Sequence, residues 1–221
     1  MEPALTEPSG RSPRTTVRRL PEKQVRDRTV LDAVLDAGRV AHVAVRDDDG
    51  QPYVVPVAYA RDGDAVVFHG STGSRLFRSL ADGAPTCLTV TLLDGLLAAR
   101  SVFESSMHYR CAMVLGTATV LEGDAELAAL ERVTEHLLPG RWADARQPNR
   151  KELAATLVLA LPLSEWSVKV SDSPPDDAEE DLDLPYWAGV VPLHEVAGPP
   201  QPAPDLRGTP PVPSYVTSWT R

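Results

Sequence analysis

The residues best suited to chemistry lie in one turn, where an apolar β-branched run ends and a helical pattern begins. The turn reads Phe68-His69-Gly70-Ser71-Thr72-Gly73-Ser74-Arg75-Leu76. Backbone N–H groups at a helix start are unpaired and carry partial positive charge, so a phosphate there would gain several hydrogen bonds and the field of Arg75. Ordinary Gly/Ser/Thr turns with a solvated arginine have the same composition, and the turn alone leaves both interpretations open. The P-loop and dinucleotide fingerprints do not apply, because the lysine of the first and the glycine spacing of the second are missing.

Length and charge limit the classes of protein that the chain can represent. Its 221 residues, 43% of them hydrophobic, can fill one core and leave a tail. The net charge of −9 argues against wide contact with nucleic acid, which needs a basic surface. No apolar run is long enough to span a membrane, and the N-terminus has no apolar signal region. We therefore expect a cytoplasmic protein that handles a small molecule.

The remaining reactive residues predict no second site. Cys87 and Cys111 lie in apolar strand-like runs, which favours buried free thiols over a disulfide, and no metal-binding spacing can be written. The serines of the turn have no Asp and His partners in a recognisable order, and no nucleophile elbow is present. No residue is therefore assigned as catalytic, and no metal is expected.

The pattern along the chain predicts a mainly β fold with flanking helices and an extended C-terminal tail. A short amphipathic helix over residues 24–37 should end at Gly38. Six strands separated by tight acidic turns indicate a barrel, and a further strand closes the pattern. The expected strands are residues 39–46, 52–60, 65–69, 86–93, 96–103, 109–121 and 157–170. Helices are expected at 75–81, at 124–138 and after Asn149.

Composition divides the chain into four parts. Residues 1–23 are expected to form a mobile N-terminal arm, and residues 24–170 the barrel domain. Residues 171–197 form an acidic, proline-rich extension whose apolar part, 185–193, should dock on the barrel or on a second subunit. Residues 198–221 are expected to be partly disordered or strapped to the surface.

The order of these motifs resembles the pyridoxamine 5′-phosphate oxidase-like, FMN-binding split-barrel family. The resemblance covers about residues 25–193. Within the family, the chain resembles the branch of flavin-nucleotide-binding and nitroimidazole-resistance proteins. Five pieces carry it in order: Val55-Pro56-Val57-Ala58-Tyr59, the turn ending in Gly73-Ser74-Arg75, the strand opening at Tyr109-Arg110, Ser167-Val168-Lys169, and residues 187–193. The fold that this resemblance implies is a split β-barrel of six to seven antiparallel strands.

The resemblance implies a homodimer with two flavin sites in the subunit interface. The FMN phosphate would be held by Gly70, Ser71, Thr72, Gly73, Ser74 and Arg75. The isoalloxazine ring would lie on the strand of Pro56, Val57 and Tyr59, which supplies apolar walls and backbone donors. Arg110 is expected from the partner subunit, with Ser106 or Tyr109 beside it. Family members often have a lysine after the arginine of the turn, whereas this chain has Leu76, so the phosphate would meet one charge fewer.

The sequence leaves alternatives open for the role of His69 and for the function of the chain. The imidazole can donate to a phosphate or a flavin, ligate the iron of a haem, or simply bond to the backbone at a strand end. One function is an FMN-dependent oxidoreductase that passes electrons to a small nitro-aromatic or quinone-like acceptor. The alternative is a protein that binds or stores flavin, deazaflavin or haem without turnover. Pyridoxamine 5′-phosphate oxidation itself is not expected, because the C-terminal region lacks an arginine-rich site for the substrate phosphate.

Overall fold

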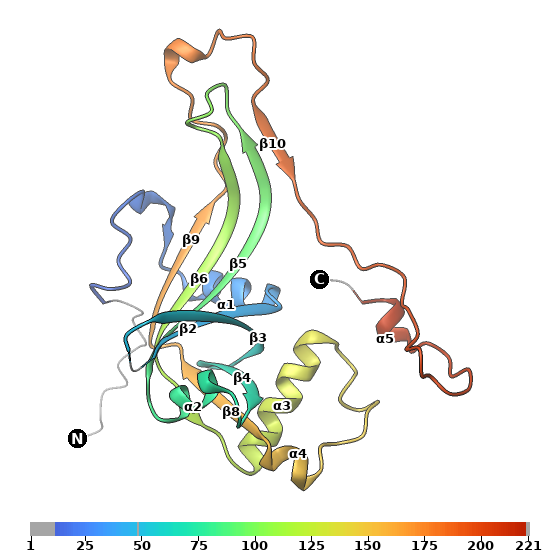
Figure 1. The fold of residues 1–221 in the computed structure, drawn as a ribbon. Coiled ribbons are helices and arrows are strands. Elements are labelled where there is room, and N and C mark those ends of the chain that lie inside the picture. Colours follow the sequence, from blue (N-terminus) through green and yellow to red (C-terminus); the bar gives the residue numbers. More distant parts are fainter. Residues whose placement is uncertain (1–11, 48, 220–221) are drawn as a thin grey trace, which may run out of the picture.

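A computed structural model describes residues 12–219 apart from residue 48. A bent antiparallel sheet forms the centre, and helices cover part of it (Figure 1). The strands are β1 (Gln24–Val25), β2 (Val40–Arg46), β3 (Pro52–Asp62), β4 (Ala65–Ser71), β5 (Pro85–Ala98), β6 (Ser106–Thr117), β7 (Thr119–Val120), β8 (Thr156–Pro162), β9 (Glu165–Ser171) and β10 (Gly189–Pro192). The α-helices are α1 (Arg28–Ala37), α2 (Arg75–Ala81), α3 (Asp124–Leu137), α4 (Arg150–Ala154) and α5 (Ser214–Thr217), with short 3₁₀ turns η1 (Pro21–Lys23) and η2 (Glu179–Asp181). The predicted mainly β fold with flanking helices is confirmed.

The sheet order explains why the barrel is split. Neighbouring strands run in the order β1-β9-β6-β5-β2-β3-β4-β8-β7, and β10 adds to β5. Strand β3 changes partner along its length: Pro52 to Ala58 pair with β2, whereas Tyr59 to Asp62 pair with β4. The two parts of the sheet therefore diverge after this point in β3.

The core lies between the inner face of the sheet and helix α1. Alternate residues of β5 and β6, such as Leu88, Val90 and Val114, are fully buried. Helix α1 starts because the Asp27 carboxylate accepts the Thr29 N–H at 2.8 Å, and it buries Leu31, Val34 and Leu35. The Tyr59 hydroxyl, also fully buried, donates to the Leu35 carbonyl at 2.7 Å. This bond fixes the end of α1 on β3.

Replacing Tyr59 with phenylalanine should lower the free energy of unfolding by about 1–3 kcal/mol, because the Leu35 carbonyl loses a buried donor. Urea denaturation of purified protein measures the change. Tyr53→Phe is the matched control, since the Tyr53 hydroxyl has no hydrogen-bond partner among the described residues. Equal losses from the two substitutions would contradict the assigned role of the Tyr59 hydroxyl.

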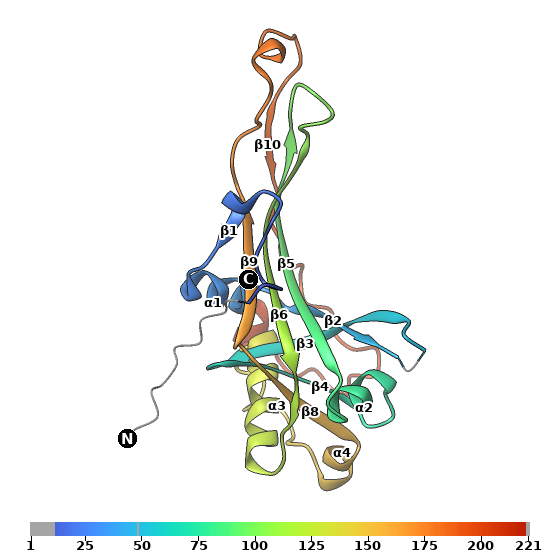
Figure 2. The same ribbon diagram turned by 90° about the vertical axis from the view of Figure 1, so that its left-hand side faces the viewer.

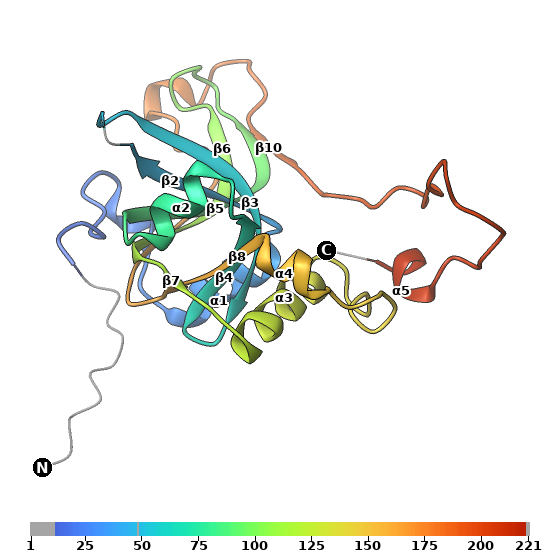
Figure 3. The same ribbon diagram turned by 60° about the horizontal axis from the view of Figure 1, so that its bottom comes forward.

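A second, smaller core lies on the outer face of the sheet beneath α3. Ala129 and Val133 of this helix pack on Ala60, Val67 and Val158 from β3, β4 and β8. Figure 3 shows α3 lying across these strands, with α4 beside it. The face of β4 that carries Val67 also carries His69.

Two details of the predicted strands are wrong. The Asp94-Gly95 pair is not a hairpin turn but a bulge inside the continuous strand β5, opposite Tyr109 and His108 of β6. The predicted strand 157–170 is two strands, β8 and β9, joined by a turn; β8 pairs with β4 and β7, and β9 pairs with β6 and β1. The Leu163 N–H of this turn donates to the Asp64 carbonyl at 2.8 Å. Both points lie within mostly apolar runs, and an apolar run alone does not show where a strand bends or ends.

The C-terminal region is held at several points. Strand β10 pairs with the outer edge of β5, from Gly189 opposite Ala98 to Pro192 opposite Gly95. Farther on, the Tyr215 hydroxyl donates to Asp144 at 2.7 Å and the Trp219 indole donates to the Leu137 carbonyl at 2.9 Å. Residues 1–11 and 220–221 of the predicted terminal segments lie outside the described residues. In the described part of the chain, no helix has the length and apolarity needed to cross a bilayer.

Candidate functional site

The candidate site lies where β3 and β4 diverge. The last paired position between these strands is Tyr59 opposite Phe68, while β4 continues to pair with β8 as far as Ser71. Before Tyr59, strand β3 is paired with β2 on its other edge. The β3–β4 ladder therefore does not reach Pro56 and Val57 on β3, or residues His69 to Ser71 on β4. The facing edges of the two strands are unpaired with each other at these residues. Backbone donors and acceptors on such edges can bind the polar rim of a planar ligand.

Internal hydrogen bonds close the turn between β4 and α2. The Thr72 N–H donates to the Ala155 carbonyl at 3.0 Å, and the Ser74 N–H donates to the Ser71 carbonyl at 2.9 Å. The Gly73 N–H donates to Ser71 Oγ at 3.1 Å. Ser74 stands at the N-cap of α2 and makes no side-chain cap bond. A phosphate at this turn would therefore meet hydroxyl groups, Arg75 and the first N–H groups of α2 rather than the three bonded N–H groups.

Arg75 is the cation at this turn. Its guanidinium carbon lies 4.4 Å from the centre of the Tyr53 ring, which is a cation–π contact. Among the described residues, Arg75 takes part in no salt bridge, so none of their carboxylates neutralises its charge. The Tyr53 contact was not expected from the sequence, because β3 and α2 are brought together only by the fold.

Helix α2 is positioned by close packing on β4. A Cβ on Gly70 would lie 2.2–2.6 Å from atoms of the Phe77 ring, so only glycine allows this approach. The Phe77 ring in turn packs on Phe68, with ring centres 5.9 Å apart. Leu76, at the position where the family resemblance implied a lysine, is 2% exposed and belongs to the core. The position at which a second positive charge was expected is therefore occupied by an apolar residue that anchors α2.

His69 brings an unsatisfied nitrogen to the site. Its Nδ1 atom is buried and has no hydrogen-bond partner among the described residues. Burial lowers the pKa of the His69 imidazole below its ordinary value, so the ring is neutral at pH 7. A buried polar atom without a partner costs free energy, which a ligand that hydrogen-bonds or coordinates to it would recover.

The lowered pKa of His69 predicts a pH effect on stability. The unfolded chain takes up a proton near pH 6.5 and the folded chain only at lower pH, so stability should fall as the pH drops below about 6.5. His69→Gln should remove part of this loss, as measured by urea denaturation between pH 7.5 and 5. His136, whose pKa burial also lowers, contributes to the same loss and is unchanged in this variant. An unchanged profile in His69→Gln would contradict the prediction.

The remaining predicted site residues are Tyr59, at the point where β3 and β4 diverge, and three residues of β6. Tyr59 is fully buried in the core, which leaves only its backbone for a ligand. Arg110 forms two hydrogen bonds, of 2.9 and 2.7 Å, with Asp94, which raise the pKa of its guanidinium. Ser106, Tyr109 and Arg110 lie on β6, in a different part of the sheet from β4. The structure thus groups the β3, β4 and α2 residues and separates the β6 residues from them. Within the described residues, no cluster of His, Cys, Asp or Glu side chains is arranged to hold a metal ion.

Comparison with known proteins identifies the family. The sequence profile described as pyridoxamine 5′-phosphate oxidase matches residues 27–170, which contain the whole candidate site. The chain belongs to this family. A search of proteins with curated functions gives no match. The predicted split-barrel family is therefore confirmed.

Solved structures place the chain near flavin- and haem-binding relatives. The structure described as the FAD and heme binding protein from Mycobacterium smegmatis is 47% identical and has a TM-score of 0.84, with 88% of this chain and 96% of that chain covered. The structure of a flavocytochrome from Azotobacter vinelandii is 38% identical, with a TM-score of 0.88 and 95% and 97% covered. A candidate 5-nitroimidazole antibiotic resistance protein from Bacteroides thetaiotaomicron, 20% identical with a TM-score of 0.57 over 66% and 86%, shares the fold.

Proposed function

We propose that the chain binds a flavin nucleotide where β3 and β4 diverge and serves as a flavin-dependent oxidoreductase. The observation that carries the proposal is Arg75, a cation with no acidic partner in the described chain, resting on Tyr53 at the head of α2. A flavin nucleotide has a phosphate that matches Arg75 and a planar ring that matches the strand edges beside it. The acceptor would be a small nitro-aromatic or quinone-like compound.

The residues present fit such a cofactor. Arg75 and the hydroxyls of Ser71 and Ser74 would hold the phosphate, while the backbone of Pro56 and Val57 and the unpartnered His69 nitrogen would face the ring. The flavin, when bound, supplies the redox chemistry, and the chain supplies orientation and apolar walls. FMN and FAD share the ring and its first phosphate. The M. smegmatis relative is described as binding FAD, so both nucleotides belong in the proposal.

A homodimer would complete the site. Ser106, Tyr109 and Arg110 lie away from Arg75 within one chain, so they reach a flavin only from a second subunit. Arg110 would bring its Asp94 partner with it, because the two side chains form a bidentate pair. A paired arginine orients a ligand by hydrogen bonding more than by net charge.

Haem binding is the second candidate. His69, whose ring is neutral and whose buried Nδ1 has no hydrogen-bond partner among the described residues, would be able to ligate haem iron. Both relatives at 38–47% identity are described as proteins that contain haem or a cytochrome centre together with a flavin. The proposed dimer is compatible with separate sites for flavin and haem. It is also compatible with a single site that binds one of them.

The visible absorption spectrum of the purified protein tests these proposals. It should be recorded as isolated and after separate additions of FMN, FAD and haem, followed by desalting. Retained flavin bands that bleach with a reduced nicotinamide, and reoxidise with a nitro-aromatic or quinone acceptor, support the oxidoreductase. A retained Soret band that His69→Gln abolishes supports the haem site. A protein that retains no flavin under any condition contradicts the proposed function.

A further inference from the structure

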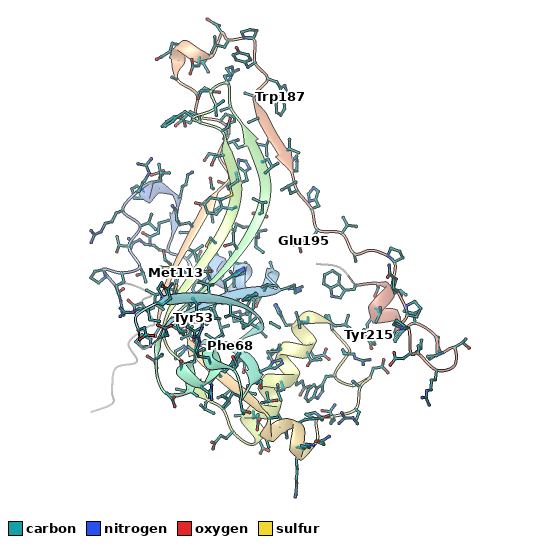
Figure 4. The ribbon with its side chains drawn as sticks, in the orientation of Figure 1. Tyr53, Phe68, Met113, Trp187, Glu195 and Tyr215 are labelled. Atoms are coloured by element: carbon teal, nitrogen blue, oxygen red, sulfur yellow. The ribbon has the colours of Figure 1, made fainter. Side chains whose placement is uncertain are left out.

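A cavity opens where the β5 bulge, strand β6 and the segment after β10 meet. Its volume is about 320 Å³, at the lower end of the range of about 300–1,000 Å³ for small-molecule sites. Its lining is Ala37 at the end of α1, Leu93, Asp94 and Arg110, and residues 193–195. We call it the Arg110 cavity. Figure 4 shows Glu195 on the segment that descends from β10 towards α1. Strands β5 and β6 carry this cavity, whereas β3 and β4 carry the turn at Arg75.

The bulge in β5 builds the wall of this cavity. The register between β5 and β6 shifts between Leu93 and Gly95, so Asp94 is the inserted residue. Its carbonyl accepts the Leu193 N–H at 3.0 Å, and its carboxylate pairs with Arg110 at 2.7 Å. Figure 2 shows β10, which leads to Leu193, lying along β5. Bulges re-aim side chains and are over-represented beside active sites.

The Arg110 cavity presents hydrogen-bond donors between apolar walls. The Arg110 guanidinium uses Nε and Nη2 for its two bonds to Asp94, and its Nη1 has no other acceptor among the described residues. The exposed His194 imidazole is a second donor. Leu93 and Leu193 supply apolar surface. These groups match a small flat ring whose oxygen atoms accept hydrogen bonds.

The charges of the lining favour a neutral ligand. Arg110 is paired with Asp94, and Glu195 adds a second carboxylate. A ligand carboxylate would therefore meet two carboxylates and one guanidinium, and like charges repel. Nitro and carbonyl oxygens carry only partial negative charge and avoid this repulsion. The Arg110 cavity thus fits a neutral nitro-aromatic or quinone ring and disfavours a carboxylated analogue.

We propose that the Arg110 cavity is the electron-acceptor site of the oxidoreductase and that His194 is its proton donor. The inference rests on the proposed function, in which Arg110 reaches a flavin only from a second subunit. The cavity shares this guanidinium and so comes to the flavin with it. An imidazole can carry a proton near neutral pH, and exposed His194 regains its proton from water.

The acceptor needs one hydride and one proton. A hydride from the reduced flavin brings both electrons to the acceptor. The N–H bond of the protonated His194 imidazole breaks, its electron pair stays on the ring nitrogen, and the proton forms an O–H bond on the acceptor. A quinone becomes a hydroquinone in this way. A nitro compound takes up the same hydride and proton, loses water and becomes a nitroso compound.

Binding to the flavin-free protein tests the site apart from the cofactor, because one chain supplies the whole lining. The neutral probe is para-nitrobenzyl alcohol, titrated by ligand-observed NMR. His194→Trp should fill the cavity and raise the dissociation constant at least about tenfold. Val196→Trp is the matched control, since Val196 is 87% exposed and lies outside the lining. It should change the constant by less than about twofold.

An anionic probe tests the charge argument. The carboxylate para-nitrobenzoate should bind at least about tenfold more weakly than the neutral probe. Equal affinities for the two probes would overturn the assigned ligand class. No binding of the neutral probe by the natural chain, or equal effects of His194→Trp and Val196→Trp, would overturn the site.

The proton transfer is tested in the flavin-loaded protein. His194→Gln keeps a polar side chain of similar size but cannot deliver the proton. Samples reduced with a reduced nicotinamide are mixed with para-nitrobenzyl alcohol in a stopped-flow instrument. The rate constant of flavin reoxidation should fall about 100-fold or more, as expected for loss of a general acid. Flavin affinity and the rate of flavin reduction should stay unchanged, because His194 has no part in either step.

Two failures of this experiment are distinguishable. An unchanged reoxidation rate in His194→Gln would overturn the proton donor while the flavin remains bound. Failure of the proposed function itself would appear as a protein that retains no flavin. That result would overturn the acceptor role, although the neutral probe would still bind in the Arg110 cavity.

Discussion

Replacing Arg75 with glutamate is expected to weaken flavin binding by at least about 100-fold. A hydrogen bond to a charged group contributes about 1.5–3 kcal/mol, and each 1.4 kcal/mol changes a dissociation constant tenfold. The substitution also places a carboxylate where the phosphate would lie, and like charges repel most strongly where solvent is partly excluded. Because Arg75 has no acidic partner among the described residues, its loss leaves no buried anion behind. The fold should therefore survive. Fluorescence quenching of added FMN or FAD measures the affinity.

Arg78→Glu is the matched control for this prediction. Arg78 lies on the same helix, is exposed and undergoes the same change of charge, but it is three residues farther from the turn. Its substitution should change flavin affinity by less than about threefold, a factor that long-range effects through solvent can account for. Equal losses from Arg75→Glu and Arg78→Glu would show that net charge, and not the position of Arg75 on Tyr53, controls binding.

The sequence was sufficient to predict those strands and helices whose boundaries depend on their own residues. The helix ending at Gly38, the β2–β3–β4 meander and the strand-to-helix turn at Ser71 to Arg75 all follow from periodicity and turn chemistry. The Asp94-Gly95 pair shows the limit of this reasoning. Asp-Gly favours a hairpin, but here Gly95 lies under Val190 and Val191 of β10, whose Cγ1 and carbonyl oxygen would be 3.0 and 3.1 Å from an added Cβ. This contact joins residues nearly a hundred positions apart, so no local pattern reveals it.

The candidate site, too, could be predicted from the sequence only in part. The turn and Arg75 could be found from the sequence because they are contiguous. Tyr53 could not, since its contact with Arg75 depends on how β3 and α2 meet. Leu76 looked like a missing ligand in the sequence and is an anchor of α2 in the structure. The β6 residues lie in a different part of the sheet from this turn, and a sequence pattern does not show how far apart two strands lie in the folded chain.

Gly70→Ala is expected to remove cofactor binding by a route different from the loss of charge. The added methyl would lie 2.2–2.6 Å from the Phe77 ring, far inside contact distance. The ring cannot swing away freely, because it packs on Phe68 and is 4% exposed. Helix α2 must shift instead, and Arg75 at its first position shifts with it. Overpacking of this kind costs about 1–3 kcal/mol of stability.

Gly73→Ala separates this steric effect from any general need for glycine in the turn. An added Cβ at Gly73 would meet only Ser71 Oγ, at 3.5 Å, which is an ordinary contact. Thermal unfolding and flavin titration should therefore show lower stability and weaker flavin binding for Gly70→Ala. For Gly73→Ala, both quantities should stay close to those of the natural protein. If Gly70→Ala kept its flavin affinity while losing stability, the position of α2 would not control the site. The phosphate would then have to be held by the strand edges and the partner subunit rather than by Arg75.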